Sequence, residues 1–90
     1  MIDNEKLAAA RKRIDSIDDE IAALFLQRLK AVDDAARAKR ALGTAVRDET
    51  RELEILKRIA KNMPPDARDD AEKLFKAIFS ISRDRQRPAP

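Results

Sequence analysis

The first 42 residues of this chain contain neither glycine nor proline, the two residues that are least compatible with a helix interior. Gly43 is the single glycine, and no proline occurs before Pro64. A helix that begins after Asp3 or Asn4, either of which can cap it, can therefore continue to about Leu42. Gly43 can then adopt the left-handed conformation that commonly follows a helix. The sequence thus predicts one long helix.

A second, shorter helix is expected after a loop over residues 43–47. Asp48 stands where a helix cap belongs, and the helix is expected to run to about Asn62. The pair Pro64-Pro65 prevents it from continuing.

A third helix is expected from Asp66, as its cap, to about Gln86, with Asp69 in its first turn. The chain is rich in the residues that favour helices, and its three aromatic residues are all Phe. Strands would need more β-branched and aromatic residues. We therefore predict an all-α fold of three helices in a single domain over residues 1–90, with a core over about 7–86.

The chain contains no cysteine and no histidine. Disulfides, thiol nucleophiles, thiolate or imidazole metal ligands and imidazole acid–base chemistry are thereby excluded. No signal peptide or membrane-length apolar run is visible, so a cytoplasmic protein is expected. The net charge of +3 suits an anionic partner but is too small to indicate nucleic acid.

The first helix should be roughly 57 Å long, whereas the second and third should reach roughly 21 Å and 30 Å. A pair of the shorter helices would cover only about half of it. Its apolar stripe nevertheless follows most of its length, through Leu7, Ile14, Ile17, Ile21, Leu24, Val32 and Ala35. We therefore expect a second copy of the chain to cover the rest, in an intertwined homodimer.

Polar residues interrupt the inward faces of all three helices. Arg28 and Lys39 fall within about 20° of the centre of the apolar stripe, with no acidic residue at helical spacing on it. Glu52 lies on the apolar face of the second helix, and Ser82 and Gln86 continue the face of the third. Basic side chains that extend to solvent, or an ion pair from Glu52 to one of the two cations, are the structural alternatives. Taken together, the three faces favour a polar pocket.

The spacing of the basic residues indicates how a pocket could be built. Arg28 and Lys39 are roughly 16 Å apart along the helix, so two long side chains can close on a small ligand. Arg11 lies roughly 25 Å from Arg28 and cannot join it within one chain. If two long helices pair antiparallel about residues 19 and 20, Arg11 of one copy lies beside Arg28 of the other. Active sites shared between chains are therefore expected.

These residues resemble the ligand-binding set of the all-helical chorismate mutases, a family best known as the N-terminal domain of a bifunctional chorismate mutase–prephenate dehydratase. The similarity covers about residues 7–86. Its specific blocks are residues 11–18 (RKRIDSID), Ala38-Lys39 and residues 46–52 (VRDETRE), and Ser82 with Gln86 adds a weaker one. The matching positions are Arg11, Arg28, Lys39, Asp48, Arg51, Glu52, Ser82 and Gln86.

The resemblance implies an isomerase that converts chorismate into prephenate, in aromatic amino-acid biosynthesis, without cofactor or metal. Arg28, with Arg11 of the partner chain, would bind the two substrate carboxylates. Lys39 and Gln86 would donate to the ether oxygen of the breaking C–O bond. Such a rearrangement needs no nucleophile or proton relay, but substrate positioning and donors for the developing charge.

By the same resemblance, Glu52 and the backbone amide of Asp48 would hold the ring hydroxyl, and Arg51 and Ser82 would support the site. The loop over residues 43–47 carries no family signature, which leaves substrate access undefined.

Three other functions remain open at this point. An isochorismate pyruvate-lyase uses a similar fold and pocket, although Asp48 and Glu52 favour the mutase; release of pyruvate separates the two. A helical interaction or nucleic-acid-binding module is supported only by the basic pI and requires exposed basic residues. A purely structural dimer with buried ion pairs predicts no affinity for chorismate-like dianions.

Overall fold

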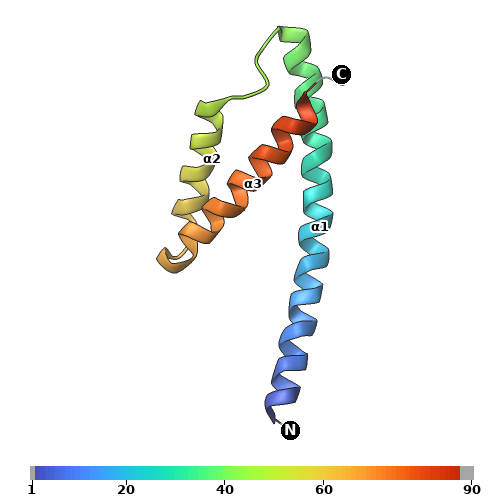
Figure 1. Ribbon diagram of the computed structural model, residues 1–90, viewed down its shortest axis with the longest axis vertical. Helices are drawn as coiled ribbons and strands as arrows, with labels where there is room; N and C mark the ends of the chain where they lie inside the picture. The colour runs from blue at the N-terminus through green and yellow to red at the C-terminus, as the bar shows by residue number, and fades with distance from the viewer. Residues whose placement is uncertain (1, 88–90) are drawn as a thin grey trace. The chain divides into compact units, whose positions relative to one another are not determined.

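The computed structural model describes residues 2–87, which form the helices α1 (Ile2–Leu42), α2 (Glu49–Lys61) and α3 (Arg68–Gln86) and the 3-10 turn η1 (Pro65–Ala67) (Figure 1). No strand occurs among these residues, so the predicted all-α class is confirmed. Within the same residues, no helix combines the length and the apolar character needed to cross a membrane.

Contacts within the chain divide it after Ala31 into two units. The first unit is a single stretch of α1, in which residues 2–24 are all exposed. Its large apolar side chains are 49–63% exposed at Leu7, Ile14, Ile17, Ile21 and Leu24. A single helix has no core of its own, and most helical stability in proteins comes from packing of an apolar face. The part of the predicted stripe that lies in this unit is thus exposed.

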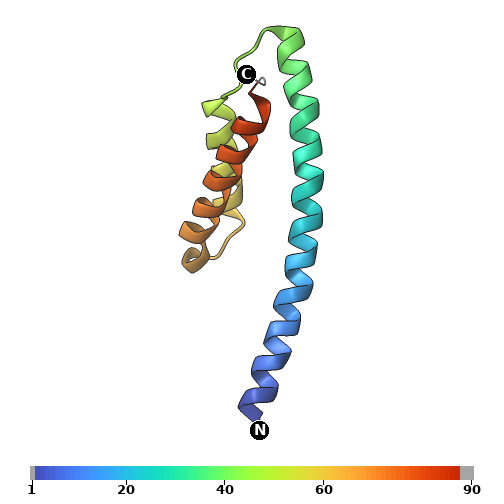
Figure 2. The ribbon, with the colours of Figure 1, turned by 45° about the vertical axis from the view of Figure 1, so that its right-hand side comes forward.

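The second unit comprises the end of α1 from Val32, together with α2, η1 and α3. Helices α2 and α3 pack against each other as an antiparallel pair joined by η1 (Figure 2). Ala36 of α1, Ile55 of α2 and Phe79 of α3 are its buried apolar residues. The ring of Phe75 meets that of Phe79 edge to face, with 6.2 Å between ring centres. This small core holds the elements that carry the candidate site.

Gly43 ends α1 as predicted, with a φ of 70°. The Gly43 N–H donates to the Arg40 carbonyl (3.3 Å) and the Thr44 N–H to the Lys39 carbonyl (2.9 Å). These two bonds form a Schellman motif, which satisfies carbonyls that a helix end otherwise leaves without partners. The motif sets the direction in which the chain leaves the helix beside Lys39.

The first helix begins two or three residues earlier than predicted. Helix α1 begins at Ile2, so Asp3 and Asn4 lie within its first turn instead of capping it. The carboxylate of Asp3 still favours this end, because the N-terminus of a helix carries partial positive charge.

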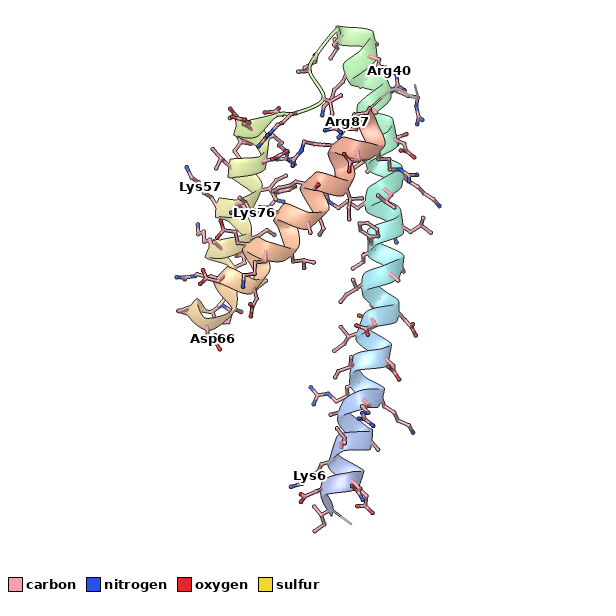
Figure 3. All side chains as sticks on the ribbon, viewed as in Figure 1. Lys6, Arg40, Lys57, Asp66, Lys76 and Arg87 are labelled. Carbon is pink, nitrogen blue, oxygen red and sulfur yellow. The ribbon has the colours of Figure 1, made fainter. Side chains whose placement is uncertain are left out.

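The predicted cap of the third helix is also wrong. Asp66 lies inside η1, at the turn between α2 and α3 (Figure 3), and Ala67 precedes α3 without a side-chain cap. Pro65 begins this turn, because its fixed φ suits the first position of a helical turn and its missing N–H is not needed there. The Ala67 N–H instead donates to the Pro64 carbonyl (3.0 Å). Asp69 occupies the first turn of α3, as predicted.

Candidate functional site

The ammonium group of Lys39, near the end of α1, forms hydrogen bonds to the loop before α2 and to the end of α3. Its Nζ donates to Gln86 Oε1 (2.7 Å) and to the Val46 carbonyl (2.9 Å). Both acceptors are neutral, and the side chain is half-buried. A cation removed from water without a counter-charge is unfavourable unless an anion reaches it. Lys39 therefore has the environment of an anion-binding residue.

Gln86 and Ser82 of α3 are the two buried polar residues among those described, at 8% and 7% exposure. This confirms the prediction that the inward face of the helix continues through them. Because an ammonium group can only donate, the amide oxygen of Gln86 must face Lys39. The Gln86 Nε2 donates to the Ser82 carbonyl (3.1 Å), and the Ser82 hydroxyl donates to the Ile78 carbonyl (2.7 Å). The amide orientation is thus defined from both sides.

Donors remain at this end of α3 for a bound molecule. The ammonium group of Lys39 has three N–H donors, of which two serve Gln86 and Val46. The Gln86 amide has two, of which one serves Ser82. A cationic and a neutral donor can thus be offered to an acceptor that gains negative charge, which is the arrangement that stabilises developing oxyanions.

Asp48 caps α2 as predicted. Its Oδ1 accepts from the Arg51 N–H (3.0 Å), and its carbonyl accepts from the Glu52 N–H (3.0 Å). The side chain of Arg51 is exposed, and its Nη1 lies 3.9 Å from Glu54 Oε2. Arg51 therefore does not contact Lys39 or Gln86.

Glu52 is paired with a residue that the sequence did not single out. The Arg83 Nη1 donates to both carboxylate oxygens of Glu52, each at 2.8 Å, and the side chains are 19% and 23% exposed for Glu52 and Arg83. The structural alternative of an ion pair from Glu52 to Lys39 is therefore wrong. An acidic residue on an apolar face signals the need for a cation, but only the packing of α2 on α3 identifies Arg83.

Arg11 and Arg28 both belong to the first unit. Arg11 is exposed and Arg28 half-buried. They are separated by seventeen residues of one uninterrupted helix, or roughly 25 Å, so they do not share a site within one chain. Their spacing in the sequence predicts the same separation.

A second unpredicted ion pair lies beside Gln86. The guanidinium of Arg85 contacts the Asp33 carboxylate with two hydrogen bonds, Nε to Oδ1 (2.7 Å) and Nη2 to Oδ2 (3.0 Å). These hydrogen bonds are the main reason that the pKa of Asp33 is lowered below its usual value, and they raise the pKa of Arg85. Both side chains are partly exposed, at 43% for Arg85 and 36% for Asp33, so the pair links α3 to α1 in contact with solvent.

A groove of about 410 Å³ runs between α2 and α3 and takes in Glu52 and Arg83, but not Lys39, Ser82 or Gln86. Its basic residues all have carboxylate partners, in the pairs Arg47–Glu49 (3.5 Å), Lys76–Glu72 (3.0 Å) and Arg83–Glu52. A groove with its charges already balanced is a weaker anion site than Lys39. We therefore place the candidate site at Lys39 and Gln86, while Glu52 lines the groove.

Comparison with known proteins identifies the family of the chain. The family model for chorismate mutase type II matches residues 10–87. A chorismate mutase from Methanocaldococcus jannaschii is 44% identical over 57 residues, which are 63% of this chain and 58% of that protein. The chain thus spans somewhat more than half the length of this curated relative. No solved structure matches the chain significantly.

Proposed function

We propose that this chain, which belongs to the chorismate mutase type II family, catalyses the rearrangement of chorismate to prephenate. The observation that carries the proposal is the half-buried ammonium group of Lys39, which is hydrogen-bonded to the buried amide of Gln86 and has no carboxylate partner within residues 2–87. A [3,3]-sigmatropic shift breaks the ether C–O bond while a C–C bond forms, and the ether oxygen gains negative charge on the way. Lys39 and Gln86 supply donors for that oxygen.

In this mechanism the catalytic donors are in place before the substrate binds. The Lys39 contact turns the Gln86 amide so that its oxygen is occupied and its remaining N–H is the group offered to the ligand. Donors that need no reorganisation during the reaction stabilise a transition state more effectively than water does. Removal of one such donor typically costs about 10²–10³ in rate.

The remaining roles follow from the family pattern. Arg28 and Arg11 of a second copy bind the two carboxylates, and together they hold the enolpyruvyl group over the ring in a reactive conformation. Glu52 accepts a hydrogen bond from the ring hydroxyl, and the backbone N–H of Asp48 donates to it. Ser82 supports the site through the backbone of α3. We propose that Arg51 turns inward when the substrate binds, since its side chain is exposed without one.

A homodimer with shared sites is part of the proposal. The exposed apolar stripe of α1 in the first unit needs a cover, and a second copy of the same helix offers a matching stripe. The 25 Å between Arg11 and Arg28 requires that one arginine of each site come from the other chain. We further propose that the enzyme acts in the cytoplasm, in the synthesis of aromatic amino acids.

The direct test is to mix the purified protein with chorismate and follow the loss of chorismate absorbance. Prephenate formation without pyruvate is the expected result. Release of pyruvate would instead indicate a lyase that acts on a related enolpyruvyl ether. Unchanged chorismate would contradict the proposed function.

The shared site has its own test, in which an Arg11→Ala chain and an Arg28→Ala chain are refolded together. Half of the dimers formed by random exchange contain one chain of each kind, and each of these has one site with both arginines intact. The mixture should therefore recover roughly a quarter of the wild-type activity. Each variant refolded alone is the control, and a mixture as inactive as these controls would contradict sites shared between chains.

A further inference from the structure

The Arg83–Glu52 pair is arranged symmetrically. A single nitrogen, Nη1 of Arg83, lies 2.8 Å from each oxygen of the Glu52 carboxylate. An ionised carboxylate offers about four acceptor positions, two on each oxygen. The arginine uses one position on each oxygen and leaves one on each for another donor. The contact therefore orients the carboxylate without saturating it.

The surroundings of Glu52 make this contact necessary for a charged acceptor. Leu53, Leu56 and Phe79 line the same groove, and only 19% of the Glu52 side chain is exposed. A partly desolvated carboxylate is favourable only when it is paired and hydrogen-bonded. Arg83 is the cation that the fold supplies, one residue after Ser82 and three before Gln86 on α3.

We infer that Arg83 is a positioning residue that holds Glu52 as an oriented acceptor for a ligand hydroxyl. This inference rests on the proposed function, since it assigns the hydroxyl to the substrate ring. Arg83 does not touch the reacting bond; it acts through Glu52. Its removal leaves Glu52 free to rotate or to turn to solvent, and hydroxyl recognition is lost while the Lys39–Gln86 donors are retained.

The experiment compares wild type with Arg83→Met, Arg83→Lys and a matched control, Arg87→Met. Arg87 is exposed on the same end of α3 and pairs with Asp84 (3.2 Å). Two probes are titrated by calorimetry: a bicyclic ether dicarboxylate that mimics the transition state and bears the ring hydroxyl, and its counterpart without the hydroxyl. The rate with chorismate is measured in parallel.

Wild type and Arg87→Met should prefer the hydroxyl-bearing probe by about tenfold to a hundredfold, the usual range for a hydrogen bond to a charged group. Arg83→Met should lose most of this preference by binding the hydroxyl-bearing probe more weakly, with little change for the other. Its kcat/KM with chorismate should fall by a similar factor. Arg83→Lys, which keeps the positive charge, should recover part of both.

Three results would overturn the inference. Equal weakening of both probes by Arg83→Met would mean that the pair only holds α2 to α3. The Arg83→Met protein could also fail to fold. In that case, a folded Arg83→Lys protein that keeps the full preference for the hydroxyl-bearing probe but melts at a lower temperature leads to the same conclusion. A wild-type protein without preference would exclude a hydroxyl contact altogether. Hydroxyl-dependent binding without chorismate turnover would instead contradict the proposed function and leave the role of Arg83 supported.

Discussion

Two neighbouring residues at the end of α3 connect it to the last turns of α1 in contrasting ways. Arg85 forms a partly exposed ion pair with Asp33, and its charge is balanced. Gln86 is buried and accepts from Lys39, whose charge is not balanced by either of its partners. The same two helices are thus joined once by opposite charges and once by a cation bonded to neutral groups.

This difference distinguishes a contact that stabilises the fold, Arg85–Asp33, from a contact that prepares a ligand site, Lys39–Gln86. In an exposed ion pair both charges already have a partner, so no ligand is needed to balance them, although the net contribution to stability is small. The charge of a desolvated cation with neutral partners is balanced only when an anion binds. Substitutions at the two contacts should therefore affect different quantities, activity at one and stability near neutral pH at the other.

The largest effect is expected from Lys39→Met. The variant removes a desolvated charge, so its melting temperature should be equal to that of wild type or higher. Its activity should fall by about 10²–10³, because one donor to the ether oxygen is lost. Thermal melting and chorismate turnover measure the two effects.

Arg40→Met is the matched control for Lys39→Met. Arg40 is the next residue on α1 and is exposed, and it is labelled in Figure 3. Its replacement should leave activity close to that of wild type. A Lys39→Met protein that unfolds would mean that Lys39 is needed for the fold, and the contrast with Arg85 would disappear.

Gln86→Glu should make the rate depend on pH. Near neutral pH the new carboxylate can only accept, and it would face an oxygen that gains negative charge. When protonated it can donate again, so activity should be low near neutral pH and recover as the pH falls. A pH–rate profile from about pH 4 to 8 measures this recovery.

Gln27→Glu, at an exposed position of α1, provides the control for the charge change alone and should leave the profile as in wild type. An unchanged profile for Gln86→Glu would mean that Gln86 does not contact the reacting oxygen.

The smallest effect is expected from Asp33→Asn, and it should concern stability alone. The pKa of Asp33 is lowered in the folded chain, mainly by its hydrogen bonds from Arg85. Its contribution to stability is therefore present above the unfolded pKa of about 3.9, and is lost as the pH falls through the lower folded value. Wild type should melt slightly above Asp33→Asn at neutral pH, and the difference should vanish in acid.

Asp84→Asn is the control for this comparison, because Asp84 pairs with Arg87 at a more exposed position. It should shift the melting temperature less than Asp33→Asn. Chorismate turnover by Asp33→Asn should stay within about threefold of wild type, since the pair is not part of the proposed site. If the melting difference instead grew as the pH fell toward acid, Asp33 would not be stabilised by its ionised contact with Arg85.

The features that could be predicted from the sequence are those determined by neighbours along the chain. Gly43 as the end of α1 and Asp48 as a cap follow from local backbone chemistry. Gln86 could be predicted because helical spacing alone places it on the inward face. The failures at Asp66 and Asn4 are also local. Pro65 begins a 3-10 turn around Asp66, and α1 starts two residues before Asn4.

The partners of charged residues could not be predicted in the same way. Residues 82–87 include three arginines, and nothing in their order shows that Arg83 meets Glu52, thirty-one positions away, or that Arg85 meets Asp33. These pairings depend on how the helices of the second unit pack. Helical spacing predicted which polar residues face inward, and only the fold identifies the partners of the charged ones.

Lys39 contacts the loop that follows α1 through both its backbone and its side chain. Its carbonyl accepts from Thr44 and its ammonium group donates to Val46. Surface loops generally tolerate insertions and deletions, but the length of this one is matched to the reach of a single side chain. An extra residue between positions 44 and 46 would move the Val46 carbonyl and, with it, the ammonium group that Gln86 orients. The number of residues in this loop therefore determines where the Lys39 ammonium group is held.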